Sequence, residues 1–179
     1  LPSGCPPTRV VSDRRGNQGA SPGTTGIINN IATAGLTAMD LWRHYQYTLD
    51  REYLERYAYP VIREVVRFYI NILEKRNDSK YYIPKALSYE SPEELLCSNT
   101  TNDLAAIRNL FPAFVEASDK LHQDKQLRRK AEDVLDNLAP FVFTKVPEEA
   151  KHWGPLKPGD PIIAYGTRLK TGLPGHPWS

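Results

Sequence analysis

The sequence is poor in the features that mark several large classes of protein. Its two cysteines, Cys5 and Cys97, are too few to indicate a redox compartment, and one disulfide or two free thiols both stay open. No apolar run approaches the roughly 20 residues that span a bilayer, and neither an initiator Met nor a signal-peptide core opens the chain. The sequence therefore predicts no membrane partner, and it reads as a piece of a longer polypeptide.

An excess of one charge is also missing. The chain has 23 Lys and Arg against 21 Asp and Glu, interspersed with one another, so we expect no nucleic-acid partner. Four His and no clustered Cys or His give no support to a metal site. The segment "GNQGASPG" lacks the preceding strand and following Lys of a phosphate-binding loop, and we expect no cofactor.

Helical periodicity is what the sequence does have. Apolar spacing predicts a mainly α fold with four helices, over residues 25–48, 51–75, 101–121 and 125–138. The short connections predict antiparallel hairpins, with Asp50, Thr101 and Asp124 at helix starts and Pro60 kinking or dividing the second helix. The six apolar side chains chosen as buried are Ile31, Leu41, Val65, Phe68, Ile107 and Phe114.

The two ends of the chain have no such period. Residues 1–23 hold Pro, Gly, Ser and Arg and predict an irregular N-terminal segment. Residues 141–179 predict a Pro/Gly-rich irregular segment that leads to further sequence, with "PIIAYG" as its strand candidate. This segment is too long for an ordinary connection, so we expect its packing partner to lie outside the sequence.

An acidic loop, "SYESPEE", runs into the third predicted helix. Taken by themselves, Glu93 and Glu94 are best explained as ordinary acidic residues on a solvated loop. In the first turn of that helix, Asp103 is expected to cap the helix. Its alternative role is to accept a hydrogen bond from a substrate hydroxyl or to orient an acidic group, with a lowered pKa. Arg108 is expected to lie on the helix surface by default. Alternatively, it pairs with Asp103 or with an oxygen of the substrate. Trp42 lies on an apolar stripe, which favours core packing over sugar stacking.

Four motifs in a fixed order resemble a known family. They are "LW-x-HY-x-YT-x-D", "AYP", Ser-Pro-Glu and "T-x-D", and they extend over about residues 19–140. In this order they resemble the catalytic domain of family 95-like glycoside hydrolases, the six-hairpin enzymes related to α-L-fucosidases. The resemblance implies that residues 24–140 are part of an (α/α)6-barrel catalytic domain. It aligns Glu93 with the family's general acid, with Glu90 as the alternative, and gives Asp103 and Arg108 substrate-binding roles.

The resemblance implies a hydrolase that cleaves an oligosaccharide or glycoside by carboxylic acid/base catalysis, such as an α-L-fucosidase-like exo-glycosidase. The alternative is a non-catalytic helical-hairpin module that binds carbohydrate or a partner protein. Two of six hairpins would not complete the barrel, so we expect these 179 residues to be inactive alone, with the second catalytic carboxylate outside the sequence. Two N-x-S/T triplets, at Asn77 and Asn99, lean toward a secreted or extracytoplasmic location.

Overall fold

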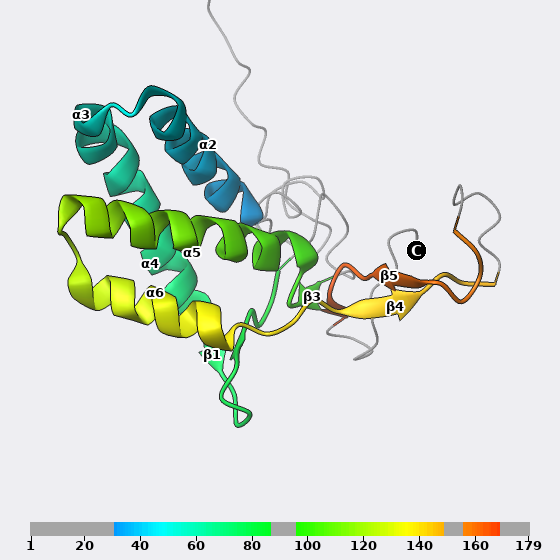
Figure 1. The fold of residues 1–179 in the computed structure, drawn as a ribbon. Helices are drawn as coiled ribbons and strands as arrows, with labels where there is room; N and C mark the ends of the chain where they lie inside the picture. The colour runs from blue at the N-terminus through cyan, green and yellow to red at the C-terminus, as the bar shows by residue number, and fades with distance from the viewer. Residues whose placement is uncertain (1–30, 87–95, 149–155, 169–179) are drawn as a thin grey trace, which may run out of the picture.

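The computed structural model of the chain describes residues 31–86, 96–148 and 156–168. Within these ranges the protein is mainly α, with two antiparallel helical hairpins and three short two-stranded sheets (Figure 1). The predicted fold class is therefore confirmed. No helix in the described part of the chain is both long enough and apolar enough to cross a bilayer.

The first hairpin begins with α2, Ala32–Thr48, and the start predicted at residue 25 lies outside the described residues. A two-residue turn then leads to α3, Arg51–Tyr53, and Asp50 caps it as predicted, since its Oδ1 accepts a hydrogen bond from the Tyr53 N–H at 3.0 Å. The chain returns along α4, Tyr59–Ile72, and the helical residues from the start of α3 to the end of α4 span 51–72, against the predicted 51–75.

A π-helical turn, η1, Leu54–Ala58, separates α3 from α4. The Tyr59 N–H donates to the carbonyl of Leu54, five residues back, so this turn holds one residue more than an α-helical turn. Pro60 follows directly, in the first turn of α4, where its missing N–H costs no intrahelical hydrogen bond. The predicted division of this helix near Pro60 is thus confirmed.

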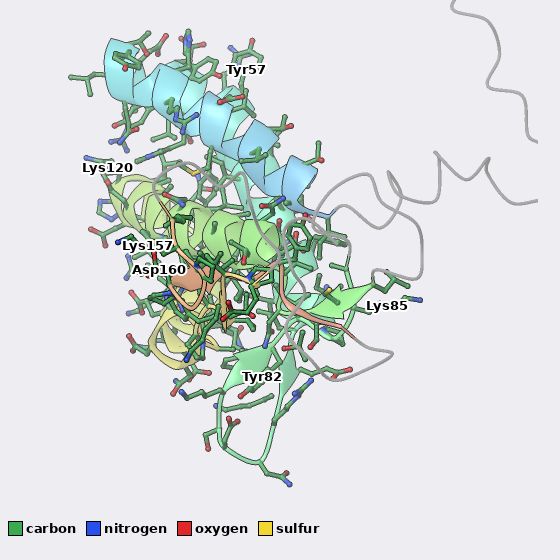
Figure 2. The ribbon with its side chains drawn as sticks, turned by 90° about the vertical axis from the view of Figure 1, so that its right-hand side faces the viewer. Tyr57, Tyr82, Lys85, Lys120, Lys157 and Asp160 are labelled. Carbon is green, nitrogen blue, oxygen red and sulfur yellow. The ribbon has the colours of Figure 1, made fainter. Side chains whose placement is uncertain are left out.

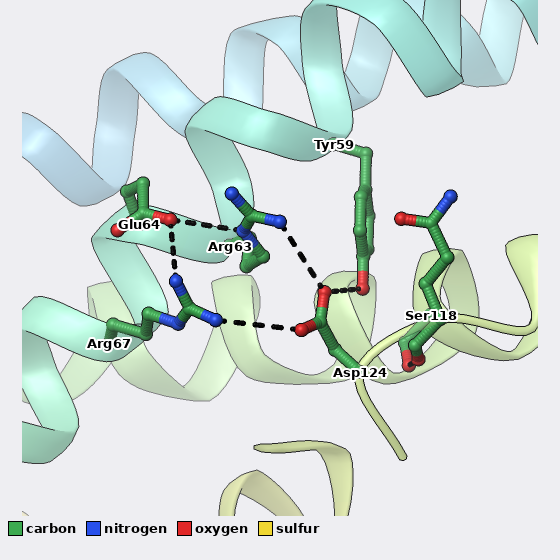
Figure 3. Close-up of polar contacts among 7 residues, drawn as sticks. Tyr59, Arg63, Glu64, Arg67, Ser118 and Asp124 are labelled. Atoms are coloured by element: carbon green, nitrogen blue, oxygen red, sulfur yellow. Dashed lines mark hydrogen bonds and ion pairs between the residues drawn. The ribbon is translucent and has the colours of Figure 1, made fainter. Parts of the chain in front are cut away.

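The second hairpin pairs α5, Thr101–Leu121, with α6, Lys125–Asn137, close to the predicted bounds. The N-cap of α5 is Thr100 rather than the predicted Thr101. Asp124 is the N-cap of α6, but its backbone is left-handed (φ 50°) and its side chain does not cap the helix. Its carboxylate instead accepts a hydrogen bond from the Tyr59 hydroxyl at 2.8 Å, so the turn between α5 and α6 is bound to the first hairpin (Figure 3).

Three small antiparallel sheets complete the described structure. After α4 the chain forms a hairpin of β1, Glu74–Lys75, and β2, Tyr81–Tyr82. Farther along, β3, Cys97–Ser98, pairs with β6, Thr167–Arg168. The strand predicted in "PIIAYG" is β5, Pro161–Ile163, and it pairs with β4, Phe143–Lys145. The described part of the predicted irregular segment thus pairs with itself, through β4 and β5, and with the rest of the chain, through β6 and β3. The expectation of a further packing partner outside the sequence stays a prediction.

Helix α5 is the centre of the core, because it contacts α2, α4 and α6. Its core-facing side chains include Ile107 and Phe114, and both are fully buried, as predicted. The approach of α2 to α5 is close: a Cβ placed on Gly35 would lie 2.8 Å from the Cβ of Ala106. Tyr69 of α4 closes the same region, since its hydroxyl donates to the carbonyl of Ile31 at 3.0 Å.

The other four predicted core residues correct the helical phase. Ile31, Leu41 and Val65 are only partly buried, and Phe68 is 40% exposed. The core face of α4 is instead formed by fully buried Ile62, Val66 and Tyr69, of which Val66 and Tyr69 lie one residue beyond the predicted Val65 and Phe68. The physical reason is the extra residue in the π-helical turn, which shifts every later residue of the helix by one position around the axis.

Candidate active site

The N-terminal ends of α2 and α5 lie at the same end of the molecule, together with β3 (Figure 1). The acidic loop belongs to the chain that joins the first hairpin to α5, and residues 87–95, with Glu90 and Glu93, lie outside the described residues. The structure does describe the two arms that flank this loop, residues 83–86 and 97–99. Figure 2 views the molecule from this end, with Lys85 labelled on the first arm.

The two arms pair with each other at the base of the acidic loop. The N–H of Ala86 donates to the carbonyl of Cys97, and the N–H of Cys97 donates to the carbonyl of Ala86, both over 2.9 Å. This reciprocal pair is an antiparallel bridge. Both residues are buried, at 0% and 2% exposure. The two arms are therefore held together at Ala86 and Cys97.

Asn99 adds a second clamp between the arms. Its N–H donates to the carbonyl of Ile83 at 3.0 Å, and its side-chain Oδ1 accepts from the N–H of Ile83 at 2.9 Å. Its backbone is left-handed (φ 51°), a conformation that Asn adopts more readily than most residues. Sequence reasoning treated Asn99 only as part of an N-x-T triplet. The side chain is 5% exposed and committed to Ile83, whereas Asn77 of the other triplet is exposed.

Residues 160–168 form a strap that contacts the second arm, residues 97–99, and the first residue of α5. Thr101, the first residue of α5, donates its N–H to the carbonyl of Tyr165 at 2.7 Å and its hydroxyl to the carbonyl of Ala164 at 2.5 Å. At Gly166 (φ 151°) a Cβ would lie 2.6 Å from the carbonyl oxygen of Ser98, so the strap approaches this arm as closely as only glycine permits. The N-terminus of α5 is thus fixed by chain segments more than 60 residues apart.

Asp103 lies beneath these arms, in the first turn of α5, and is 0% exposed. The hydroxyl of Thr100, also 0% exposed, donates to Oδ2, and Oδ1 has no hydrogen-bond partner. Burial raises the pKa of this carboxyl to about 7, and the Thr100 hydrogen bond lowers it only in part. The lowered pKa expected for a helix N-terminus is therefore wrong, because loss of solvation outweighs the helix dipole.

The chemistry open to Asp103 follows from this environment. Near neutral pH it exchanges a proton, so it can act as a hydrogen-bond donor as well as an acceptor. A buried oxygen with no partner is rare in folded proteins and calls for an explanation in terms of a ligand, water or function. The predicted substrate-binding role stays a prediction, because Asp103 has no exposed surface among the described residues.

Arg108, the other predicted substrate-binding residue, lies one turn further along α5. One of its terminal nitrogens donates to the carbonyl of Ala139 at 2.9 Å, and its guanidinium lies 5.2 Å from the ring centre of Phe141. Its Nε is buried without a hydrogen-bond partner. The described contacts of Arg108 therefore join α5 to the chain after α6 rather than to Asp103, and a contact with a substrate oxygen stays a prediction.

The aromatic residues at the end of α2 are not part of this site. Trp42 is 3% exposed and packs against Tyr45 with ring centres 5.2 Å apart, so its predicted role in the core is confirmed. Exposed His44 packs on Tyr53 at 4.2 Å. Across residues 31–86, 96–148 and 156–168, no group of three His, Cys, Asp or Glu side chains is arranged to hold a metal ion.

The two helical hairpins of the described residues are consistent with a fragment of an (α/α)6 barrel. The sequence pattern described as the glycosyl hydrolase family 95 catalytic domain matches residues 14–151. Because this match covers well over half of the chain, the chain belongs to glycosyl hydrolase family 95. The resemblance inferred from the four motifs is thereby confirmed.

Two curated relatives agree with this assignment. The chain is 28% identical over 125 residues to the kojibiose hydrolase of Flavobacterium johnsoniae, a match that covers 70% of this chain. It is 29% identical over 90 residues to alpha-L-fucosidase 2 of Arabidopsis thaliana, a match that covers 45% of this chain. The matched regions are 16% and 10% of the lengths of these relatives. The chain therefore corresponds to a small part of each.

Proposed function

We propose that this chain is part of the catalytic domain of a glycosidase that hydrolyses an oligosaccharide or glycoside by carboxylic acid/base catalysis. Membership of family 95 gives the reaction class, and the names of the two relatives suggest kojibiose or an α-L-fucoside as substrate. Because the chain spans so little of either relative, the activity is proposed for the longer polypeptide, and residues 1–179 alone are expected to be inactive.

The observation that carries this proposal is the closed base of the acidic loop. Hydrogen bonds of Ala86 and Asn99 hold together the two arms that flank residues 87–95, and the second arm leads directly into the N-terminus of α5. A general acid must be held within hydrogen-bond reach of the leaving oxygen, and a short loop anchored on a rigid body meets this requirement better than a long free one. This anchoring supports Glu93 as the acid, with Glu90 as the alternative.

Asp103 is proposed as a residue that orients the acid or accepts a hydrogen bond from a substrate hydroxyl. Its support is the unpartnered, buried Oδ1 next to the arm that returns from the acidic loop. Arg108 is proposed as a second contact for substrate oxygens through its buried, unpartnered Nε. The second catalytic carboxylate that glycoside hydrolysis requires is expected from another part of the polypeptide.

The test is Glu93→Gln in the polypeptide translated from the complete reading frame, with Glu90→Gln as the matched control. Glutamine keeps the size of the side chain and removes the proton donor, so hydrolysis of a natural linkage should fall by roughly 10² to 10⁴. An activated aryl glycoside needs little protonation, and its cleavage should fall far less. Initial rates on kojibiose, an aryl α-D-glucoside and an aryl α-L-fucoside separate the two candidate substrates.

The control decides which carboxylate is the acid. Near-parental rates for Glu90→Gln support Glu93, and transfer of the whole defect to Glu90→Gln supports the alternative. Equal, near-parental rates for both variants would contradict the proposal and return the acidic loop to a solvated connection. The predicted extracytoplasmic location is tested separately, by fractionation of the source cells.

A further inference from the structure

A groove with a basic lining runs between α4 and α6. It has a volume of about 570 Å³ and is lined by Arg67 of α4 and by residues of α6, namely Gln126, Leu127, Arg129, Lys130 and Asp133. This volume falls within the range that is common for ligand sites in proteins. The lining residues lie on α4 and α6, outside the arms of the acidic loop and outside α5, so the catalysis proposed above does not account for the groove.

Positive charge outweighs negative charge on α6 and the strand beside it. The carboxylate in the lining, Asp133, lies 3.5 Å from the ammonium group of Lys130 and 3.7 Å from that of Lys75 in β1. One carboxylate is therefore matched by two ammonium groups. Arg129 is exposed and takes part in no ion pair among the described residues. Its charge adds to the excess.

The cation on the other side of the groove, Arg67, is already balanced. It shares two carboxylates with Arg63, namely Glu64, at 2.9 Å, and Asp124, at 3.5 Å (Figure 3). Two guanidinium groups and two carboxylates leave no net charge. The unbalanced positive charge of the groove therefore lies on its α6 side, where an anion would meet Arg129 first.

Tyr81 of β2 holds the ammonium groups of Lys75 and Lys130 in place. Each lies 4.8 Å from the centre of the tyrosine ring, and Lys130 also donates a hydrogen bond to the Tyr81 hydroxyl at 2.6 Å. That hydroxyl donates to Asp133 at 2.5 Å, and Tyr81 is only 4% exposed. The N–H of Ala139, after α6, donates to the carbonyl of Tyr81 at 3.0 Å, which fixes the strand to the helix. Side chains held in this way lose little conformational entropy when they bind an anion.

We propose that this groove binds an acidic carbohydrate chain through its carboxylate or sulfate groups. Arginine can donate two parallel hydrogen bonds to such a group, and lysine supplies a point charge. Gln126 adds amide donors and an acceptor for sugar hydroxyls, and Leu127 adds apolar surface for the C–H face of a sugar ring. Membership of a glycosyl hydrolase family favours a carbohydrate over other polyanions. Binding here requires no hydrolysis and does not depend on Glu93.

The experiment is affinity electrophoresis of the polypeptide translated from the complete reading frame, in gels that contain polygalacturonate, dextran sulfate or neutral dextran. We expect at least one of the two polyanions to slow the protein at about 20 mM salt, and to slow it less at about 300 mM, because salt screens the contacts. Neutral dextran should have no effect. Slowing by polygalacturonate identifies carboxylate as the group that is bound, and slowing by dextran sulfate identifies sulfate.

Three variants locate the binding surface. Arg129→Gln should raise the dissociation constant at least about threefold, and its combination with Lys130→Gln at least about tenfold, since each removes one charged contact. Arg43→Gln is the matched control, because Arg43 is also an exposed helix arginine and lies on α2, outside the groove. It removes the same net charge and should leave the dissociation constant unchanged.

Lysine acetylation tests the unaltered protein, in case a variant fails to fold. The side chains of Lys130 and Lys120 are similarly exposed, at 46% and 43%, but Lys120 lies on α5, outside the groove. The polyanion that slows the protein should protect Lys130 from acetylation severalfold and leave the reactivity of Lys120 unchanged. Mass spectrometry of the acetylated peptides measures both.

The proposal is wrong if neither polyanion slows the protein, or if neutral dextran slows it equally. Equal losses in Arg129→Gln and Arg43→Gln would overturn it as well, since net charge rather than the groove would then govern binding. Equal protection of Lys120 and Lys130 has the same consequence. Tighter binding to double-stranded DNA than to either polysaccharide would identify nucleic acid, rather than carbohydrate, as the ligand.

Discussion

The hydroxyl of Tyr59 donates a hydrogen bond to the carboxylate of Asp124 over 2.8 Å, although 65 residues separate them (Figure 3). Tyr59 is 1% exposed, and burial, followed by the hydrogen bond to Asp124, raises its pKa to about 12. The same carboxylate lies 3.8 Å from Arg63 and 3.5 Å from Arg67. The start of α4 is thus tied to the turn that joins α5 and α6.

The first prediction concerns this link. Tyr59→Phe removes the hydroxyl and keeps the ring, which packs parallel to that of Phe114 at 5.9 Å. The free energy of unfolding should fall by about 1.5 to 3 kcal/mol, the usual range for a hydrogen bond to a charged group. Tyr82→Phe is the control, because its hydroxyl donates to Asp78 on the exposed surface and should matter little. Urea denaturation of both variants measures the difference, and equal losses would contradict it.

The second prediction concerns the crossing of α2 and α5. In Gly35→Ala the new Cβ would lie 2.8 Å from the Cβ of Ala106 and 3.0 Å from the Tyr69 hydroxyl. Overpacking of this kind costs about 1 to 3 kcal/mol and should exceed the roughly 1 kcal/mol that alanine gains in helix propensity.

A double variant separates the two contributions of Gly35→Ala. Adding Ala106→Gly removes the clashing methyl and should recover part of the lost stability, which a thermal melt of the single and double variants detects. If the double variant loses more stability than the two single variants lose together, steric contact at Gly35 is not the cause.

The third prediction is a pH dependence of stability. The pKa of Asp103 is about 7 in the folded chain and 3.8 in its ordinary environment, so the folded chain binds one more proton between these values. The free energy of unfolding should therefore fall as the pH rises from about 4 to 7, by up to about 4 kcal/mol at roughly 1.4 kcal/mol per pKa unit. Below and above this window Asp103 should add no slope.

Asp103→Asn is the matching variant, since the amide keeps the shape of the carboxyl and does not titrate. Urea denaturation between pH 4 and pH 8 should show a flatter curve for the variant than for the parent, with the largest gain in relative stability at pH 8. Parallel curves would show that Asp103 is ionised in the folded chain at these pH values.

The fourth prediction distinguishes the two features of Asn99. Asn99→Gly keeps the left-handed backbone accessible but leaves the buried N–H of Ile83 without its acceptor, at a cost of about 1 to 3 kcal/mol. Asn99→Ala loses the same acceptor and also forces an alanine to φ near 51°, so it should be less stable than the glycine variant. Thermal melts compare them, and a more stable alanine variant would exclude backbone conformation as the reason for Asn99.

Much of the helical architecture could be predicted, because it depends on local signals. The cap at Asp50 and the break near Pro60 follow from capping chemistry and the missing proline N–H, which act within a few residues. The motif order was sufficient to identify the family, which the matched residues 14–151 confirm. The acidic loop was recognised in the same way, and the roles of Glu90 and Glu93 stay predictions.

What the sequence could not determine depends on groups that are distant along the chain. The π-helical turn shifted the buried face of α4 by one residue. Helix α4 has apolar residues on two neighbouring faces, so its sequence pattern alone does not indicate which face is buried. The pKa of Asp103 depends on the elements that bury it. A helix N-terminus should lower this pKa, but burial raises it to about 7. The clamp between Asn99 and Ile83 spans 16 residues, and the contact of Thr101 with Ala164 spans 63. Local periodicity determined where the helices are. Tertiary packing decided which of their side chains are buried from solvent.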